Sequence, residues 1–214
     1  MLRSKWWSKN FLAMLGNDLI DLQLAQVQSD WRRKGYLSKL FNDDEQRAIA
    51  LAQDPGLLVW MMWSMKEAAY KVHNRNSGIR RYEPLAYSCM LEMNGVSTAQ
   101  GAVMQGNESF LCRSSVYQGM LHTVALGRGA VFGEVKTLHM ENQQDYWKAF
   151  GSQSGLVLAK CPKGLPMVYD PASGRTGPAS VSHHGRGLCV VYLQGNEYRQ
   201  PFFSPEKRPA KLLL

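Results

Sequence analysis

Hydrophobic positions along the chain follow two spacings, one typical of helices and one typical of strands. An apolar run from Met14 to Leu22 predicts a short buried strand near the N-terminus. The segment from Ser29 to Leu40 carries basic residues around a glycine, and it predicts a short helix and turn with a basic face. The first forty residues therefore combine strand and helix.

Two helix starts follow in the next segment. Asn42 with Glu45 three residues later is the capping-box arrangement, which predicts a helix through Leu51. Asp54 followed by Pro55 predicts a second helix, because proline at the first helical position loses no needed hydrogen-bond donor. We expect this second helix to end near residue 72.

From residue 85 the apolar positions alternate with a period of two, which is the spacing of strands. The dipeptides Asn94-Gly95, Gly106-Asn107 and Gln118-Gly119 are turn signals that divide this region. They predict an antiparallel meander of four strands, at residues 85–93, 96–104, 109–116 and 120–126.

A second unit follows the meander. A helix is expected at residues 142–150, and the region rich in Gly, Pro and Ser at 162–180 is expected to form loops. Strands are expected at residues 156–161, 180–184 and 188–193. The predicted organisation is an N-terminal extension (1–13), a first half (14–128), a second half (129–203) and a C-terminal tail (204–214).

Composition narrows the class of protein. The chain has 214 residues, 45% hydrophobic and 20% charged, which is typical of a folded domain rather than a disordered one. The net charge of +8 favours an anionic partner. The longest apolar run, residues 57–63, is far too short to span a membrane, so no membrane partner is expected.

The cysteines indicate a reducing, cytoplasmic environment. No two of them form a Cys-x-x-Cys pair, which argues against a structural zinc site of that kind. Each lies in an apolar, strand-like segment, where free cysteine behaves as a small hydrophobic residue. The four are Cys89, Cys112, Cys161 and Cys189.

The second helix carries the most informative chemistry. On a helical projection, Glu67 and Lys71 lie opposite the apolar stripe, and their spacing allows two interpretations. One is a surface ion pair worth about 0.2–0.5 kcal/mol. The other adds Asp18, an acid within the first predicted strand. Asp18 and Glu67 would then bind Mg²⁺, which takes one or two carboxylates and completes its shell with water and phosphates. Lys66 and Lys71 would neutralise phosphate charge.

A third segment lies near the C-terminus. Ser182 and His183 follow one another at the end of a predicted strand, where a hydroxyl and an imidazole can donate hydrogen bonds to phosphate oxygens. Lys163 precedes this strand in the loop region. Metal binding by His183 and His184 is an alternative, although the sequence offers no obvious third ligand.

Together these segments resemble the 4′-phosphopantetheinyl transferase superfamily. The family's Gly-x-Asp element is matched by residues 16–18, and its Trp-Ser-x-Lys-Glu-Ala-x-x-Lys element by residues 63–71. Phe41 and Glu45 resemble its Phe-x-x-x-Glu element. Residues 180–185 resemble its Ser-x-Ser-His element. The resemblance covers the N-terminal half well and the C-terminal half thinly.

The resemblance implies transfer of the phosphopantetheine arm of coenzyme A to a serine of an apo carrier protein, with release of adenosine 3′,5′-bisphosphate. It implies Asp18 and Glu67 as Mg²⁺ ligands and Asp18, Glu67 and Lys71 as the catalytic set. The phosphate and nucleotide contacts would be Lys66, Lys71, Lys163, Ser182 and His183. The general base is either Glu67 or a water on the metal.

Two departures from the family pattern matter. Larger members carry a second acid two residues after the first Asp, where this chain has Ile20 and then Asp21, as small bacterial synthases do. The Ser-His element also follows the Lys-Glu element, whereas it comes first in larger members. We therefore expect an α+β pseudo-dimer of two halves in swapped order, each a small antiparallel sheet with helices, acting as a monomer rather than a trimer.

The predicted partners are coenzyme A and an acidic carrier protein of fatty acid, polyketide or peptide synthesis. The carrier would dock on the basic residues Arg32, Arg33 and Lys34, for which a solvated face is the simpler interpretation. Two alternatives stay open. The net charge and six tryptophans suggest a nucleic-acid-binding module, although no nucleic-acid-binding motif is present. A relative that has lost catalysis and serves as a scaffold is the other.

Overall fold

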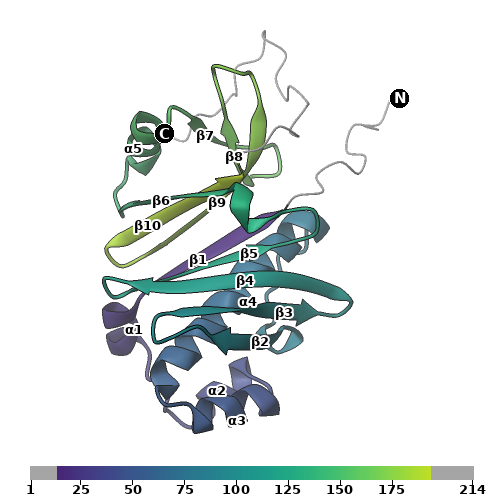
Figure 1. Ribbon diagram of the computed structural model, residues 1–214, viewed down its shortest axis with the longest axis vertical. Helices are drawn as coiled ribbons and strands as arrows, with labels where there is room; N and C mark the ends of the chain where they lie inside the picture. The colour runs from purple at the N-terminus through teal and green to yellow at the C-terminus, as the bar shows by residue number, and fades with distance from the viewer. Residues whose placement is uncertain (1–13, 194–214) are drawn as a thin grey trace.

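The computed structural model describes residues 14–193, which form two five-stranded antiparallel sheets with helices (Figure 1). The first sheet contains, in spatial order, β1 (Leu15–Asp21), β5 (Met120–Leu126), β4 (Glu108–Tyr117), β3 (Thr98–Gln105) and β2 (Ser88–Met93). The second contains β6 (Val135–Glu141), β10 (Gly187–Leu193), β9 (Thr176–His184), β8 (Pro166–Tyr169) and β7 (Val157–Lys160). The predicted extension (1–13) and tail (204–214) lie outside the described residues.

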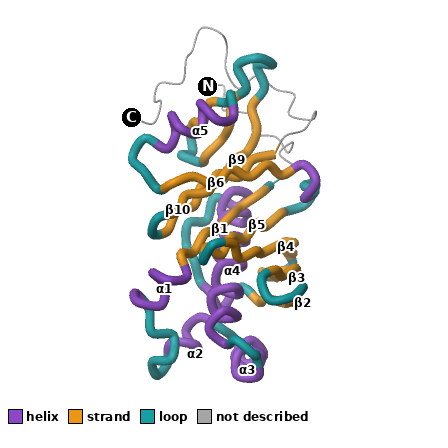
Figure 2. Tube along the Cα trace, turned by 60° about the vertical axis from the view of Figure 1, so that its left-hand side comes forward, coloured by secondary structure: helices purple, strands orange, loops and turns teal. Residues whose placement is uncertain are grey.

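The helices gather mainly around the first sheet. They are α1 (Leu22–Gln28), α2 (Tyr36–Leu40), α3 (Asp43–Leu51), α4 (Pro55–Ser77) and α5 (Tyr146–Ser154), with 3-10 turns η1 (Pro84–Ala86) and η2 (Phe132–Glu134). Figure 2 shows α4 running along one face of the first sheet, and α5 lies with the second sheet. The predicted α+β architecture of two halves, each an antiparallel sheet with helices, is confirmed. The predicted boundary at residue 128 stays a prediction.

Local signals account for the two helix starts. Asn42 and Glu45 form both hydrogen bonds of the capping box at the start of α3. Asp54 caps α4 by accepting a hydrogen bond from the Leu57 amide, with Pro55 as the first helical residue. The helix runs past the predicted end to Ser77, because it continues until Gly78 takes the left-handed conformation that closes it.

The strand predictions for residues 85–126 are confirmed as a meander. The four strands β2 to β5 pair in sequence, each antiparallel to the next. Other segments differ from expectation. Residues 162–180 were expected to be loop but contain β8 and the start of β9, while α1 and β6 had no clear signal. By contrast, residues 29–40 form a turn followed by the short helix α2, in keeping with the predicted short helix and turn.

Close packing of α4 against β1 explains the glycine at the start of the first strand. A Cβ atom on Gly16 would lie 2.2 Å from the Ala68 carbonyl oxygen and 3.0 Å from the Lys71 Cβ. Only glycine allows the helix to approach the strand this closely. The next residues of β1 are therefore held directly against the helix that carries Glu67.

The two sheets meet along β1. This strand pairs with β5 on one side and contacts β9 and β10 on the other. Its outer amides bond to side chains of β9: the Asn17 amide donates to Ser180 Oγ (3.1 Å) and the Asp21 amide to His184 Nδ1 (2.9 Å). An apolar cluster of Leu15, Leu19, Val124, Leu126, Cys189, Val191 and Leu193 fills this junction. The junction places β9, from the second half, beside the acidic end of β1.

Among the helices of residues 14–193, none combines the length and apolar character that crossing a membrane requires.

Candidate active site

A pocket of about 270 Å³ opens where β1, α1, α4 and the end of β9 meet. Two carboxylates, Asp18 and Glu67, lie in its wall, and His183 and His184 of the second half line it as well. The remaining walls are mainly aromatic and polar, formed by Leu19, Ile20, Ala25, Gln28, Ser29, Tyr36, Trp60 and Trp63. The pocket therefore joins both halves of the chain.

Asp18 lies on β1 and is held by a lysine from α4. Lys71 Nζ lies 3.5 Å from Asp18 Oδ1 and donates a hydrogen bond of 2.6 Å to the Asn17 carbonyl oxygen. Burial raises the pKa of Asp18, and the nearby Lys71 charge opposes this shift. The neighbouring Ser64 hydroxyl opposes it further. The lysine thus pairs with Asp18, not with Glu67 one helical turn before it.

Glu67 faces the same pocket from α4. Burial, and then the negative charge of Asp18, raise the pKa of Glu67 to about 7, with Lys71 acting in the opposite direction. A carboxyl with this pKa exchanges its proton near neutral pH. The Asp18 effect also means that the two acids are close enough to repel each other when both are ionised.

This pair of acids fits a divalent cation. Two carboxylates that repel each other, with one lysine paired to Asp18, leave net negative charge when both are ionised, and a cation would relieve that repulsion. The donor set is all oxygen, which is what Mg²⁺ prefers. With two carboxylates from the protein, water and substrate phosphates have room to complete the coordination shell.

The two residues Ser182 and His183 of the Ser-His element lie in different environments. His183 is exposed and lines the pocket. Ser182 is buried, and its Oγ accepts a hydrogen bond of 2.9 Å from the Asn17 side-chain amide. Adjacent residues of a strand point to opposite faces, so only one of the two can face the pocket.

Comparison with known proteins bears on the first half. Residues 14–118 match the model of the 4′-phosphopantetheinyl transferase superfamily. This segment belongs to the 4′-phosphopantetheinyl transferase superfamily. The holo-[acyl-carrier-protein] synthase of Thermotoga maritima is similar in structure, with a TM-score of 0.41 and 9% sequence identity, over 72% of this chain and 80% of that one. No curated protein matches the chain at a significant level.

One lysine of the family's Lys-Glu element lies away from the pocket. Lys66 is fully buried, and its Nζ donates to Glu45 Oε2 (2.7 Å), the Leu40 carbonyl (2.7 Å) and the Pro84 carbonyl (3.1 Å). All three of its donors are used. The expected phosphate contact is therefore corrected to a structural role, since Lys66 points into the core while Glu67, the next residue, faces the pocket.

Lys163 and Ser182 also lie outside the pocket lining. Lys163 lies in the β7–β8 turn, where its carbonyl accepts a hydrogen bond from the Arg80 side chain (3.0 Å). This turn is at the end of the second sheet far from α1 (Figure 1). Of the nucleotide contacts that the superfamily resemblance implied in the second half, only His183 reaches the pocket.

The family's Phe-x-x-x-Glu element is explained by the same buried lysine. Glu45 Oε2 accepts from Lys66 and from the Asn42 amide, while its Oε1 accepts from the Cys89 amide at 2.7 Å. Lys66 Nζ lies 5.0 Å from the centre of the Phe41 ring. The element therefore joins α3, α4 and β2 behind the pocket.

Sequence reasoning missed the residues that α1 and α2 contribute. Gln28, Ser29 and Tyr36 line the pocket, but α1 had no periodic signal that would place them there. The predicted docking residues Arg32, Arg33 and Lys34 are exposed on the turn between Ser29 and Tyr36. The basic turn is thus at the rim of the pocket.

Proposed function

We propose that this chain transfers the 4′-phosphopantetheine arm of coenzyme A to a serine of an apo carrier protein and releases adenosine 3′,5′-bisphosphate. The observation that carries this assignment is the pair of acids: Asp18 on β1 and Glu67 on α4 line one pocket. They occupy the Gly-x-Asp and Lys-Glu positions of the superfamily, to which residues 14–118 belong.

Asp18 and Glu67 would hold Mg²⁺ in this function. When bound, the ion supplies positive charge that neutralises the pyrophosphate and orients it for attack. Lys71 keeps the Asp18 carboxylate in position through its contacts of 3.5 Å to Oδ1 and 2.6 Å to the Asn17 carbonyl. His183, exposed at the end of β9, is proposed to donate to phosphate oxygens of the nucleotide.

The reaction requires one bond to form and one to break. The carrier serine oxygen bonds to the phosphorus attached to pantetheine, the bond from that phosphorus to the bridging oxygen breaks, and the nucleotide leaves. The serine proton must go to a base. Glu67, a carboxylate that lines the pocket, is proposed as the group of this chain that accepts it.

The surroundings of the pocket support a protein substrate and a site complete within one chain. The exposed basic turn at residues 32–34 adjoins the pocket and suits an acidic carrier. Because His183 of the second half and Glu67 of the first line one pocket, we propose a monomeric pseudo-dimer. All four cysteines are free, in keeping with a cytoplasmic location.

Mass spectrometry of carrier proteins tests the activity. The protein is incubated with coenzyme A, Mg²⁺ and apo carriers of fatty acid, polyketide and peptide synthesis, and one added phosphopantetheine on one carrier is the expected result. Asp18→Asn and Glu67→Gln should lose transfer while keeping the wild-type circular dichroism spectrum. Exposed Asp145, in the second half, gives a matched control, Asp145→Asn, which should keep activity.

Two outcomes would contradict the assignment. Absence of any adduct, with salt-sensitive nucleic-acid binding in its place, would favour the nucleic-acid-binding alternative. Binding of coenzyme A and carrier without transfer would indicate an inactive scaffold.

A further inference from the structure

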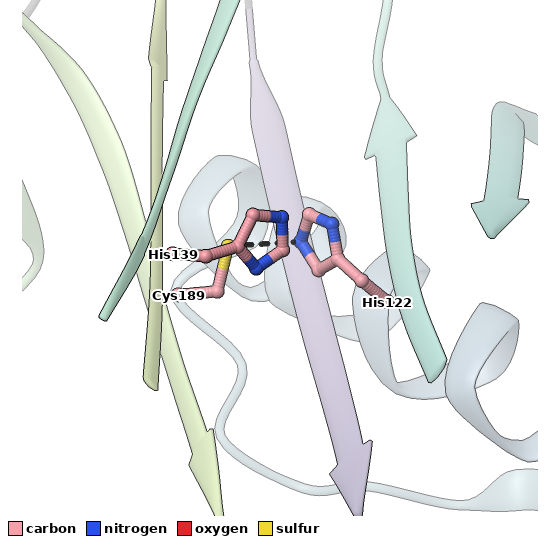
Figure 3. A group of neighbouring side chains, drawn as sticks. All are labelled: His122, His139 and Cys189. Carbon is pink, nitrogen blue, oxygen red and sulfur yellow. Dashed lines mark hydrogen bonds between the residues drawn. The ribbon is translucent and has the colours of Figure 1, made fainter. Parts of the chain in front are cut away.

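A group of side chains of the types that can ligate a metal ion lies at the junction of the sheets, apart from the pocket of Asp18 and Glu67. His122 on β5, His139 on β6 and Cys189 on β10 bring their ligand atoms within 4.8 Å of one another. His122 and Cys189 are buried, while His139 is exposed. Figure 3 shows the three converging from strands on either side of β1. In residues 14–193 this is the one such group of three His, Cys or acidic residues.

The strand register supports a preformed site. His139 and Cys189 are directly opposed partners in the β6–β10 pair, so their side chains project from the same face of the sheet. His122 reaches them from the first sheet, with its Nε2 atom 3.3 Å from Cys189 Sγ. The His122 and His139 rings lie edge to face, 5.0 Å apart. Two strands of one sheet and one of the other thus supply the ligands.

Hydrogen bonding around His122 is oversubscribed without a metal. The Asn17 side-chain nitrogen has two hydrogens but lies near three acceptors: Ser182 Oγ (2.9 Å), the Cys189 carbonyl (3.3 Å) and His122 Nε2 (3.3 Å). The Cys189 thiol also lies against this Nε2, so in the tautomer whose Nε2 carries the lone pair, two donors compete for it.

A metal ion would resolve this competition. If an ion takes the His122 lone pair and the Cys189 thiolate, the two Asn17 hydrogens are left with two acceptors. The hydrogen bonding of Asn17 is also incomplete at its other side-chain atom, because Oδ1 is buried and has no hydrogen-bond partner among the described residues. The fully buried Asn17 side chain is thus incompletely satisfied beside the three ligand atoms.

We propose that His122, His139 and Cys189 bind a zinc ion that links the two sheets. Imidazole and thiolate are ligands that suit Zn²⁺ and not Mg²⁺, so the site is chemically distinct from the Asp18 and Glu67 pocket. Binding breaks the S–H bond of Cys189, forms a zinc–sulfur bond and releases one proton to solvent. Water at the exposed His139 side completes the tetrahedron.

The geometry requires only a small contraction. Zinc bonds of about 2.0–2.3 Å in a tetrahedron separate neighbouring ligand atoms by about 3.3–3.6 Å. The distance of 3.3 Å from His122 Nε2 to Cys189 Sγ is within about 0.3 Å of the nitrogen–sulfur value, which is the upper end of this range. The widest separation in the group, at most 4.8 Å, must shrink by about 1 Å, and the exposed His139 side chain has the freedom to move.

Metal binding to the purified full-length protein tests the site without any assay of transfer. The protein is stripped of metal, titrated with Co²⁺ and then with Zn²⁺, and monitored by absorption. The expected result is one Co²⁺ per chain, with a near-ultraviolet thiolate-to-cobalt band that Zn²⁺ abolishes. Zinc should also raise the melting temperature, since it binds the folded state.

His139→Gln is the main variant, because this exposed residue can be replaced without opening the core. It should weaken zinc binding by more than about 10-fold, the lower limit for loss of even an outer-shell partner. Cys189→Ala should remove the charge-transfer band. His183→Gln, at an exposed histidine of the neighbouring strand, and Cys161→Ser, at a half-buried cysteine, should leave zinc affinity unchanged.

Clear results would overturn the assignment. These are wild-type protein that binds no stoichiometric zinc, cobalt bound without the thiolate band, or full affinity in His139→Gln. If Asp18→Asn lowers zinc affinity as much as His139→Gln does, the metal occupies the carboxylate pocket and the site at the junction is refuted.

Discussion

Lys66 and Glu45 form a fully buried ion pair, with Lys66 Nζ 2.7 Å from Glu45 Oε2. The pair fixes α4 to α3, and the second Glu45 oxygen bonds to the Cys89 amide of β2. Glu67, which follows Lys66 on the helix, is thereby turned toward the pocket. A buried pair of this kind is costly to break, because loss of one partner leaves an uncompensated charge.

Lys66→Met is therefore expected to destabilise the fold rather than act on the chemistry. Removing one partner of a buried pair costs about 3–5 kcal/mol, and chemical denaturation measures the loss. The exposed pair Arg47–Asp44 provides a control, since Asp44→Asn should cost less than about 1 kcal/mol. If the Lys66→Met protein keeps wild-type stability and loses only its affinity for coenzyme A, the result would favour the phosphate contact predicted from the sequence.

Gly16→Ala tests the close approach of α4 to β1. The added Cβ would lie 2.2 Å from the Ala68 carbonyl, so helix and strand must separate, at a cost of about 1–3 kcal/mol. Gly133→Ala is the matched control, because a Cβ there meets nothing within 4 Å. Thermal unfolding of both variants should show a marked loss for the first and little change for the second.

Some features were predictable from the sequence because their signals are local. The capping box at Asn42 and the Asp54-Pro55 start are set by residues within one helical turn, and the meander by its turn dipeptides. The direction of Lys66 was not predictable, since Glu45 stood out as a helix cap and as part of the Phe-x-x-x-Glu element but not as its ion-pair partner. Orientation depends on which element packs against which side of the helix.

The residues that meet at the junction between the sheets were even less predictable from the sequence. His122, His139 and Cys189 carry no spacing signal, because three separate strands bring them together through long-range register. Ser182 and His183 were predicted to act together, although adjacent strand residues face opposite sides. In β1, by contrast, the acid at position 18 stood out because Asp is depleted in strands.

Ser182→Ala and His183→Ala should separate stability from binding. Ser182 is buried and accepts a hydrogen bond from Asn17, so its loss should cost about 1 kcal/mol of unfolding free energy with little change in KM for coenzyme A. His183 is exposed at the pocket, so its loss should raise that KM without lowering stability. Steady-state kinetics gives KM for coenzyme A, and chemical denaturation gives the free energy of unfolding, for each of the two variants. A reversed pattern would exchange the two roles.

The raised pKa of Glu67 predicts how stability varies with pH. Between the ordinary value of 4.5 and about 7, the unfolded chain has lost the Glu67 proton while the folded chain still holds it. Stability relative to Glu67→Gln should therefore fall as pH rises through this window. Denaturation curves of the two proteins at several pH values measure the difference, and parallel pH profiles would contradict it.

The same group is expected to set the pH dependence of the proposed Mg²⁺ binding. The ion needs the ionised carboxylate, so affinity should rise as pH increases through about 7 and level off above it. Calorimetric titration with Mg²⁺ across this range checks the trend. If Mg²⁺ affinity stays constant from about pH 5 to about pH 8, Glu67 is not a ligand.

Reversal of charge on the basic turn tests carrier docking. Arg32, Arg33 and Lys34 are exposed between two pocket residues, so changing all three to Glu should raise KM for an acidic carrier about 10-fold or more and leave KM for coenzyme A unchanged. The wild-type KM for carrier should rise with salt, whereas that of the variant should not. An equal charge change at Arg128, Lys136 and Lys160, which are exposed elsewhere, separates a local contact from net charge. If the two triple variants raise KM for the carrier equally, the basic turn is a solvated face and not a docking surface. Docking depends on where the charges lie, whereas an effect of net charge does not.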